Sequence, residues 1–419
     1  MQEGRLEMQY KCPTCGADMI FNAAGGTLKC SGCGREEQIE GFEQNGEVRQ
    51  MADIPPRTAV MTDSDQVHIY KCQSCGAEIQ TDAQTVATEC SFCGSPVILT
   101  DRMAGTLRPD YIIPFKIEKR EANKAFQEWV AKLKFSPAEF RNMVKVKHVE
   151  GLYAPFWIYD VAGQGSARYD CVKEKKHTQG NEEITEESHY DVYREVDLTY
   201  AKIPADASQR LDDKLMDIME PYDYGELKPF SAPYLSGYKA EKYDYQESEV
   251  FPRVKKRVED YMDNYISSTI SGYNHESRVE KHYDIKRMET HYTLFPMWIN
   301  YVKYRDKDYS FAMNGQTGKI SGHPPISKGI VSAHIAVITA IIFAILFLLR
   351  TFVHLKIHPV AAAVIGLVAA LIIVLPQASG AGRKVTVGAK TYLDETRSRI
   401  VRRYDRFTHT TTTRRTINK

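Results

Sequence analysis

Before residue 330 the sequence has no apolar run long enough to cross a bilayer, and its first ten residues lack the apolar core of a signal peptide. It also lacks the HExxH, GxSxG and Rossmann glycine signatures of three large enzyme classes. Residues 315–320, GQTGKI, resemble a phosphate-binding loop, but the first glycine is missing and Ile320 stands where Ser or Thr would bind magnesium. We therefore expect a protein that is not exported and is not an enzyme, with no catalytic residues to assign.

A long apolar region begins at residue 330. Residues 330–349 are twenty residues without a charge, and as a helix they would be about 30 Å long, the thickness of a bilayer's hydrocarbon core. After Pro359, residues 360–375 form a shorter run, which reaches spanning length only if residues 376–381 continue it. The pattern predicts a transmembrane helical hairpin over residues 330–382. A re-entrant second helix and a buried hairpin in a soluble domain are the alternatives.

Charge is distributed unevenly along the chain. Residues 1–101 hold seven Lys or Arg and fifteen Asp or Glu, a net charge of −8, whereas residues 383–419 hold eleven and three, a net charge of +8. Basic segments that flank membrane spans stay in the cytoplasm. We therefore expect a protein of the cell membrane with two spans and both termini cytoplasmic.

Residues 383–419 would then be a basic cytoplasmic tail. Its candidate contacts with anionic lipid are Arg383, Lys384, Arg402 and Arg403. A tail that is merely solvated, or folded as β-structure, is the alternative.

Eight of the nine cysteines stand in four CxxCG motifs: Cys12, Cys15, Cys30, Cys33, Cys72, Cys75, Cys90 and Cys93. Fourteen residues separate the second and third cysteines of each set of four, and the two sets are sixty residues apart, so the arrangement is an internal repeat. Each motif is typical of a knuckle whose two thiolates bind one ion, and two knuckles make a closed tetrahedral site of the structural zinc type.

The repeat predicts two zinc ribbons, at residues 1–45 and 70–101, joined by a linker over residues 46–69. Each ribbon would hold one Zn²⁺, with a β-hairpin between its knuckles. Iron in rubredoxin-like sites is the main alternative. A disulfide framework does not suit the cytoplasm, and sites shared between the repeats would not need the equal spacing.

Zinc ribbons often bind nucleic acid, which requires clusters of Lys and Arg with aromatic side chains between them. The cysteine-rich region is acidic instead, and each cysteine frame holds a single aromatic residue, Phe21 or Phe92. The composition therefore favours a protein-docking or purely structural role for the ribbons.

Residues 102–329 have the pattern of a mixed α/β cytoplasmic domain, so the expected fold class of the whole chain is α+β. Helical spacing of apolar residues predicts helices at residues 119–134, 208–219 and 250–266. Ser208 is the expected N-cap of the second helix, and Pro221 its end. Alternation predicts strands at residues 190–200, 299–304 and 309–313, the last two as a hairpin around residues 305–308.

Two stretches of this domain resemble each other: YAPFW at residues 153–157 and LFPMW at residues 294–298. Both place Pro-x-Trp at the entry to an expected strand, which suggests two related half-units, with coincidence as the alternative. The tyrosines of residues 233–245 are expected to be half-buried sheet and loop residues rather than a ligand surface. Cys171 is expected to be a small buried side chain rather than a nucleophile.

Several stretches occur together here: the paired CxxCG motifs, YAPFWIYD at residues 153–160, PYLSGYKAEKYD at residues 233–244, and NGQTGK at residues 314–319. In this combination most of the chain resembles bacterial membrane proteins described as TFIIB-type zinc-ribbon-containing, sometimes labelled primosomal (replication factor Y-like) helicases. Related proteins accompany phage-shock-type envelope-stress systems, where a zinc-ribbon membrane protein helps recruit soluble partners. The helicase label does not carry over, because the sequence has neither a usable Walker A loop nor a helicase acidic motif.

We therefore expect a membrane-anchored zinc-ribbon adaptor that docks cytoplasmic protein partners at the membrane, with a role in envelope stress implied by the resemblance. A membrane-tethered nucleic-acid-binding zinc-ribbon protein is the alternative.

Overall fold

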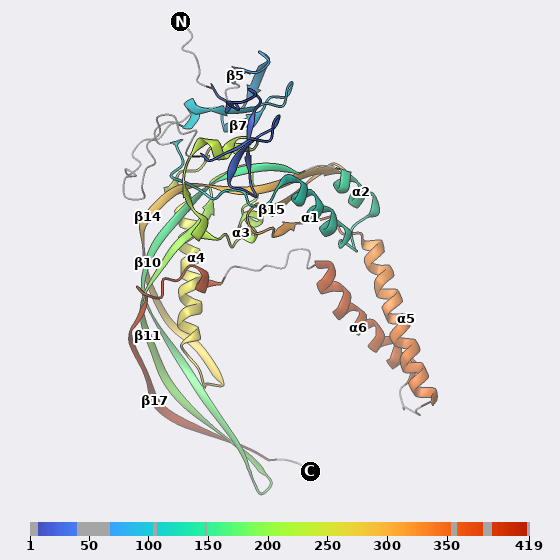
Figure 1. Ribbon diagram of the computed structural model, residues 1–419. Coiled ribbons are helices and arrows are strands. Elements are labelled where there is room, and N and C mark those ends of the chain that lie inside the picture. Colours follow the sequence, from blue (N-terminus) through green and yellow to red (C-terminus); the bar gives the residue numbers. More distant parts are fainter. Residues whose placement is uncertain are drawn as a thin grey trace.

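The computed structural model describes residues 7–39, 68–103, 107–146, 149–352, 358–379 and 388–416. Of the expected linker over residues 46–69, residues 46–67 lie outside the described residues. The fold is mixed α/β and is organised around a twelve-stranded sheet (Figure 1). A long arm of this sheet projects from the body of the protein, and two apolar helices, α5 and α6, project from the same body.

The cysteine-rich region consists of short strands: β1 (Glu7–Met8), β2 (Met19–Asn22), β3 (Thr27–Cys30), β4 (Glu36–Glu37), β5 (His68–Lys71), β6 (Glu78–Thr81), β7 (Thr85–Glu89) and β8 (Pro96–Leu99). In the first repeat, β2, β3 and β4 form a three-stranded sheet, and β2–β3 is the hairpin predicted between the knuckles. In the second repeat the hairpin prediction is wrong. There β6 pairs with β5, whereas β7 pairs with β8 and with β13 (Lys239–Glu241) of the main sheet.

Arg102 lies at the turn where the two repeats differ. Its buried guanidinium donates hydrogen bonds to the carbonyl oxygen of Asp82 and, at 2.8 Å, to that of Thr85, at the turn between β6 and β7. A charged donor at this turn engages carbonyl groups that would otherwise need strand partners. Strand β7 pairs with β13 instead, which builds the second repeat into the main sheet.

Four long strands form the arm: β10 (Glu150–Gln179), β11 (Glu182–Asp206), β14 (His275–Tyr304) and β17 (Arg399–Thr416). Their order is β17-β11-β10-β14, with antiparallel neighbours throughout. At about 3.3 Å per residue, a strand as long as β10 spans about 100 Å. The arm is the long curved ribbon in Figure 1.

Strand β11 contains the predicted strand at residues 190–200. Val192, Val196 and Leu198 are buried on one face, as the alternation predicts. Asp191 is buried too, which the alternation does not predict. Its carboxylate receives two hydrogen bonds from Arg168 and one from Arg406, which compensate for the loss of water.

Helix α4 (Glu247–Ser268) covers one face of the arm where it joins the body, and it contains the predicted apolar stripe. Its buried residues are Val250, Val254, Val258, Tyr261, Met262 and Ile266. Gly163 on β10 lets this helix approach closely, because a Cβ atom there would lie 2.6 Å from the sulfur of Met262.

Two parts of the middle domain have a similar order of elements, in line with the Pro-x-Trp similarity. The first half runs from β9 (Tyr111–Ile112) through α1 (Lys119–Ala131) and α2 (Ala138–Val146) to β10 and β11. The second runs from β13 through α4 to β14 and β15 (Lys307–Asn314). The short strands exchange partners: β9 pairs in parallel with β14, and β13 pairs in parallel with β10.

The two tryptophans repeat the same contact across these halves. Trp157 of the first half donates to the carbonyl oxygen of Tyr245 at 2.8 Å, and Trp298 of the second half donates to that of Ile117 at 3.1 Å. Each acceptor directly precedes a helix whose N-terminus has a capping box, at Glu118 for α1 and Gln246 for α4. Equivalent hydrogen bonds and caps at these positions favour duplication over coincidence.

Helix α3 (Asp213–Met219) is shorter than the predicted helix at residues 208–219. Asp212 caps it by accepting from the N–H of Leu215, so the prediction of Ser208 as the N-cap is wrong. Ser208 is buried, and its hydroxyl oxygen accepts from the N–H of Arg210 instead. The predicted hairpin is β14–β15, and its turn is tighter than predicted, with φ positive at Arg305 and Asp306.

Two further short strands are β12 (Lys228–Pro229) and β16 (Ile320–Gly322). Short 3₁₀ segments are η3 (Thr100–Met103), η5 (Tyr224–Glu226), η6 (Ala232–Leu235) and η7 (Ala389–Thr391).

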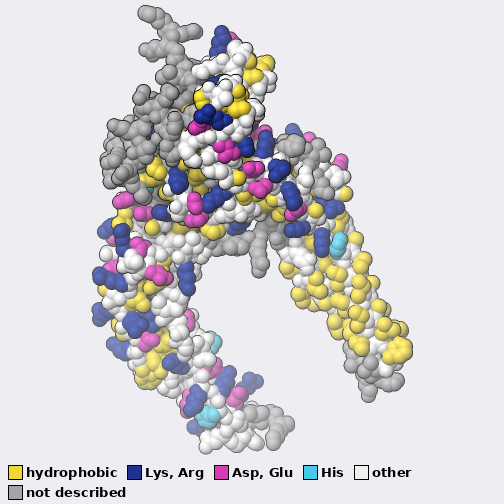
Figure 2. Space-filling model, viewed as in Figure 1, with side chains coloured by type: hydrophobic (Ala, Val, Ile, Leu, Met, Phe, Trp, Pro, Cys, Tyr) yellow, Lys and Arg dark blue, Asp and Glu magenta, His cyan; other side chains and the backbone are white. Residues whose placement is uncertain are grey.

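Helices α5 (Lys328–Phe352) and α6 (Pro359–Ser379) coincide with the predicted apolar runs. Each contains an 18-residue stretch with a mean hydropathy of 2.6, long and apolar enough to cross a membrane. Small residues of α6 face α5: a Cβ atom on Gly366 would lie 3.1 Å from the carbonyl oxygen of Thr339. The large apolar side chains point outward and cover the surface of both helices (Figure 2).

The segment after α6 is not a separate tail in the structure, contrary to the predicted domain division. Tyr392 is buried in the middle domain, and β17 pairs along β11 from Arg399 to Thr416. Alternation of polar residues with Ile400, Tyr404 and other β-formers lets this basic segment complete a sheet whose edge β11 would otherwise expose.

Candidate metal centres

The eight cysteines of the CxxCG motifs form two separate groups, one from each repeat. Within each group the sulfur atoms all lie within 4.8 Å of one another. In the first group the Sγ–Sγ distance is 3.6 Å for Cys12–Cys33 and 3.4 Å for Cys15–Cys30. In the second group it is 3.7 Å for Cys72–Cys93 and 3.8 Å for Cys75–Cys90.

These distances fit a metal centre and not a disulfide. Four thiolates about 2.3 Å from one ion lie about 3.8 Å from each other in a tetrahedron. A disulfide would bring two sulfur atoms to about 2.05 Å, and all nine cysteines are free. Each group can therefore hold one four-coordinate metal ion with ligands from a single repeat.

The four knuckles share one backbone geometry. The glycine after each motif has a φ between 73° and 75°, a conformation that residues with a Cβ atom rarely adopt. Its N–H donates to the carbonyl oxygen of the motif's first cysteine, as in Gly16 to Cys12 at 2.9 Å and Gly76 to Cys72 at 2.8 Å. The glycine of CxxCG is therefore required by the turn that brings two thiolates together.

Backbone N–H groups favour the thiolate form of Cys30 in the first repeat. The N–H groups of Gly32 and Cys33 each point at the sulfur of Cys30 at 3.4 Å. These hydrogen bonds, with that from Cys33 the largest influence, lower the pKa of Cys30 to about 6. Ser95 does the same in the second repeat, and its hydrogen bond lowers the pKa of Cys93 to about 6. Thiolates are the form that binds metal.

Cys171, the remaining cysteine, lies on β10 and is completely buried. Burial raises its pKa to about 11, so the thiol is protonated and inert at neutral pH. The prediction of a small buried side chain is confirmed.

The tyrosines of residues 233–245 are also structural in large part. Tyr238 stacks on Phe115 with ring centroids 4.2 Å apart, and Tyr234 meets Phe21 of the first repeat at 5.2 Å. Tyr243 packs against Trp157 at 4.9 Å.

The four basic residues named as lipid contacts have different positions. Arg383 and Lys384 lie outside the described residues. Arg402 lies on β17 with its guanidinium 6.0 Å from the ring of Tyr193, and Arg403 stands opposite Arg194. Both side chains are exposed on the arm.

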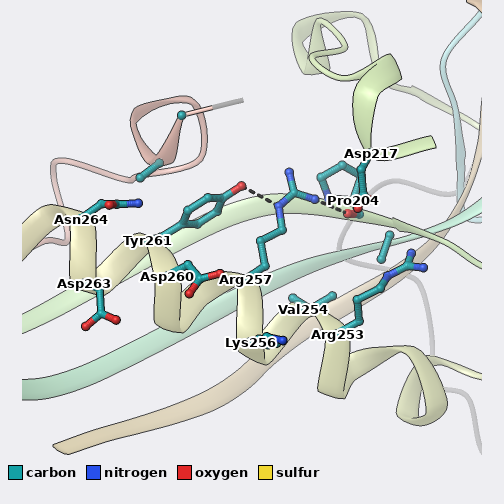
Figure 3. Close-up of a pocket in the computed structure, with 13 residues that line it drawn as sticks. Pro204, Asp217, Arg253, Val254, Lys256, Arg257, Asp260, Tyr261, Asp263 and Asn264 are labelled. Atoms are coloured by element: carbon teal, nitrogen blue, oxygen red, sulfur yellow. Dashed lines mark hydrogen bonds between the residues drawn. The ribbon is translucent and has the colours of Figure 1, made fainter. Parts of the chain in front are cut away.

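A buried ionic network, which the sequence does not reveal, joins the segment after α6 to the body. Arg257 of α4 donates from both terminal nitrogens to Glu220, at 2.8 Å to Oε1, and Tyr392 donates to Oε2 of the same carboxylate. The Arg257 guanidinium also reaches Tyr261 at 2.6 Å and the carbonyl of Pro204 at 3.2 Å (Figure 3). No spacing pattern links positions 220, 257 and 392, so sequence reasoning could not assemble them.

This network has the features of a stabilising contact rather than of a catalytic site. Both oxygens of Glu220 are occupied by protein donors, and its side chain is 1% exposed. A cleft of about 630 Å³ lies beside Arg257, Asp217 and Ala389, but Glu220 does not line it. The network holds the returning chain against α4.

Comparison with known proteins gives one relationship. The chain is 41% identical to the uncharacterized protein YdjG of Bacillus subtilis (strain 168) over 326 residues, which are 78% of this chain and 92% of YdjG. No family model matches the sequence. No solved structure matches it either.

Proposed function

This chain belongs to the same family as YdjG of Bacillus subtilis, and we propose that it is a membrane-anchored zinc-ribbon adaptor that docks protein partners on the cytoplasmic side of the cell membrane. A hairpin of α5 and α6 anchors it, two zinc ions shape its cysteine-rich units, and the arm and units provide docking surfaces. The likeness to proteins of envelope-stress systems suggests that process as the setting.

The surface of α5 and α6 supports the membrane anchor. Every residue of the most apolar stretch of α5 is at least partly exposed: Ile341 and Leu348 are each 54% exposed, and Ile372 of α6 is 68% exposed. Monomeric soluble proteins rarely expose apolar patches larger than a few hundred Å². Close packing through small residues such as Gly366 and Ala370, with large apolar residues outside, is typical of helix pairs in lipid.

The fold on both sides of the hairpin supports an even number of crossings. At its start, the N–H of Ser327 donates to the carbonyl oxygen of Phe135 at 2.9 Å. After its end, Tyr392 enters the body and β17 joins β11. One sheet cannot lie on two sides of a bilayer, which supports a topology with both ends of the hairpin on the same side. The basic charge after α6 favours the cytoplasmic side.

Each cysteine group suits zinc in a structural role. Four thiolates leave no coordination position for a substrate, and the metal would supply folding energy to units with small cores, on the order of 10–16 kcal/mol per site. The first site would use Cys12, Cys15, Cys30 and Cys33, and the second Cys72, Cys75, Cys90 and Cys93. Iron would fit the same four sulfurs, so metal analysis of the purified protein decides between the two.

The adaptor role depends most on one observation: two cysteine-rich units and an arm built on strands of up to 30 residues belong to the same body as the two apolar helices. Ion pairs on β17 argue against a nucleic-acid surface. Arg399 pairs with Asp197 at 3.3 Å, and Arg406 with Asp191 at 3.0 Å. Arg402 and Arg403 remain candidate contacts for anionic headgroups.

Cross-linking in intact cells, followed by purification from detergent extract, tests the proposal. The full-length protein should retain a defined set of partner proteins and two zinc ions. Replacing Cys12 and Cys15, or Cys72 and Cys75, by serine should remove partners, whereas the Cys171→Ser control should retain them. Identical partner sets in all variants, or salt-sensitive recovery of nucleic acid instead of protein, would contradict the adaptor role.

A further inference from the structure

The stretch that leads into the first metal group is part of the second cysteine-rich unit. Strand β1 pairs with β8, at Glu7 with Leu99 and Met8 with Ile98. Strand β8 directly follows the knuckle of Cys90 and Cys93. Five residues after β1 begins, the same stretch supplies Cys12, the first ligand of the other group.

Side chains of this stretch reach the other knuckle of the second unit. Gln9 directs its side-chain N–H at the sulfur of Cys72 at 3.8 Å, and its carbonyl oxygen accepts from the Ser74 hydroxyl at 2.9 Å. Lys11, the neighbour of Cys12, donates to the Ser74 hydroxyl at 2.7 Å. Ser74 lies between Cys72 and Cys75, so these bonds join residues beside a ligand of one group to residues between ligands of the other.

Both units also hold one segment of the middle domain. The N–H of Phe21, on β2, donates to the carbonyl oxygen of Ser236 at 3.0 Å, and the Ser236 hydroxyl donates to the carbonyl oxygen of Met19 at 2.6 Å. Three residues later, Lys239–Glu241 form β13, which pairs with β7 of the second unit. Unfolding of either unit would therefore remove contacts that stabilise the other unit.

We propose that the two metal centres bind as a coupled pair, so that a metal ion in one group raises the affinity of the other. The inference rests on the proposed zinc binding. The coupling path is the stretch from Glu7 to Lys11, together with the shared segment from Ser236 to Glu241. Loss of one ion, for example to a chelator or an oxidant at the exposed Cys75 or Cys93, would loosen both units together.

Coupling between sites is reciprocal, which gives a stringent test. Full-length protein in detergent is titrated with Co²⁺, whose thiolate complexes absorb visible light, against a competing chelator. Replacing Cys72 and Cys75 by serine should weaken binding at the first group by about 5- to 150-fold, the usual range of coupling. Replacing Cys12 and Cys15 should weaken the second group by the same factor.

A variant that keeps all eight ligands separates coupling from simple misfolding. The double substitution Gln9→Ala with Ser74→Ala should still bind two ions, but the second binding step should become weaker relative to the first. Thr14→Ala is the matched control, because Thr14 occupies in the first repeat the position that Ser74 has in the second. It should leave the titration unchanged.

Two results would overturn the inference. One is binding at each remaining group that is unaltered within twofold when the other is removed. The other is an equal effect of Thr14→Ala and of the double substitution. Two ions bound independently would refute coupling alone, whereas a protein that binds no metal would refute the proposed zinc role as well.

Discussion

Removing the hydroxyl of Tyr392 should loosen the segment that returns from α6. In the wild type this hydroxyl donates to the carboxylate of Glu220, which Arg257 also binds, and the Tyr392 ring is 2% exposed. Hydrogen bonds to buried charged groups contribute about 1.5–3 kcal/mol. Tyr392→Phe should therefore cost about that much of the local stability of residues 388–416, while its ring stays in place.

Glu220→Gln should cost more, about 3–5 kcal/mol, because it leaves the guanidinium of Arg257 buried without a counter-charge. Lys319, whose ammonium donates to the backbone carbonyl of Glu220, does not relieve this loss, since it is a second cation. The ionic network therefore predicts that Glu220→Gln lowers the local stability more than Tyr392→Phe does.

Hydrogen exchange of the full-length protein in detergent measures both effects. A loss of 1.4 kcal/mol raises exchange from locally open states about tenfold. Protection of residues 389–393 and of β17 should fall in Tyr392→Phe and fall further in Glu220→Gln. Tyr404→Phe is the control: it removes a hydroxyl from the same segment outside the network, keeps the ring that stacks on Tyr193, and should change exchange little. Unchanged protection in both network variants would refute the view that this network holds the returning chain.

Three further predictions concern separate parts of the molecule. Burial raises the pKa of Asp206 to about 7 from its usual 3.8. The native state therefore keeps a proton that the unfolded state loses, so stability should fall by about 3 kcal/mol as the pH rises from 4 to 7. Denaturation at several pH values should show this slope in the wild type and not in Asp206→Asn. Gly366→Leu should separate α5 from α6, because its Cβ atom would lie 3.1 Å from the carbonyl oxygen of Thr339. Gly329→Leu is the control, because a Cβ atom there meets nothing closer than 3.9 Å. Disulfide cross-linking of cysteines introduced on facing helix positions should detect the difference. Removal of metal by a chelator should expose residues 19–30 and 85–99 to proteolysis while β10 and β14 stay protected, and resistance of the cysteine-rich units would contradict a metal-dependent fold.

Local patterns were sufficient to predict the cysteine groups and the apolar helices. A CxxCG motif encodes its own turn, because the glycine, both ligands and the closing hydrogen bond lie within five residues. Helix α4 was equally predictable, since its stripe of Val250, Val254 and Val258 repeats with the helical period.

Features that depend on distant partners could not be predicted in this way. The second repeat has the same cysteine spacing as the first, yet β7 pairs with β8 and with β13 of the main sheet rather than with β6. Residues 383–419 are predicted to be a basic tail, because nothing in their composition shows that they pair with the edge strand β11. Strand pairing between residues about 200 positions apart is decided by the tertiary fold, not by local propensity.

The similarity between the two parts of the middle domain could be predicted only in part. Pro-x-Trp was visible in both halves, but its significance depends on the contacts that Trp157 and Trp298 make across the halves. The helix caps at Glu118 and Gln246 differ in residue type, so only their equivalent geometry shows the relationship.

A topology measurement in living cells tests the central proposal most directly. Reporters that distinguish the cytoplasm from the exterior would be fused at Met1, at Lys419 and between α5 and α6, in residues 353–357. The proposal predicts cytoplasmic signals at Met1 and Lys419, an exterior signal between the helices, and a protein that stays in the membrane during carbonate extraction. An exterior signal at either terminus, or release of the protein by carbonate, would contradict it.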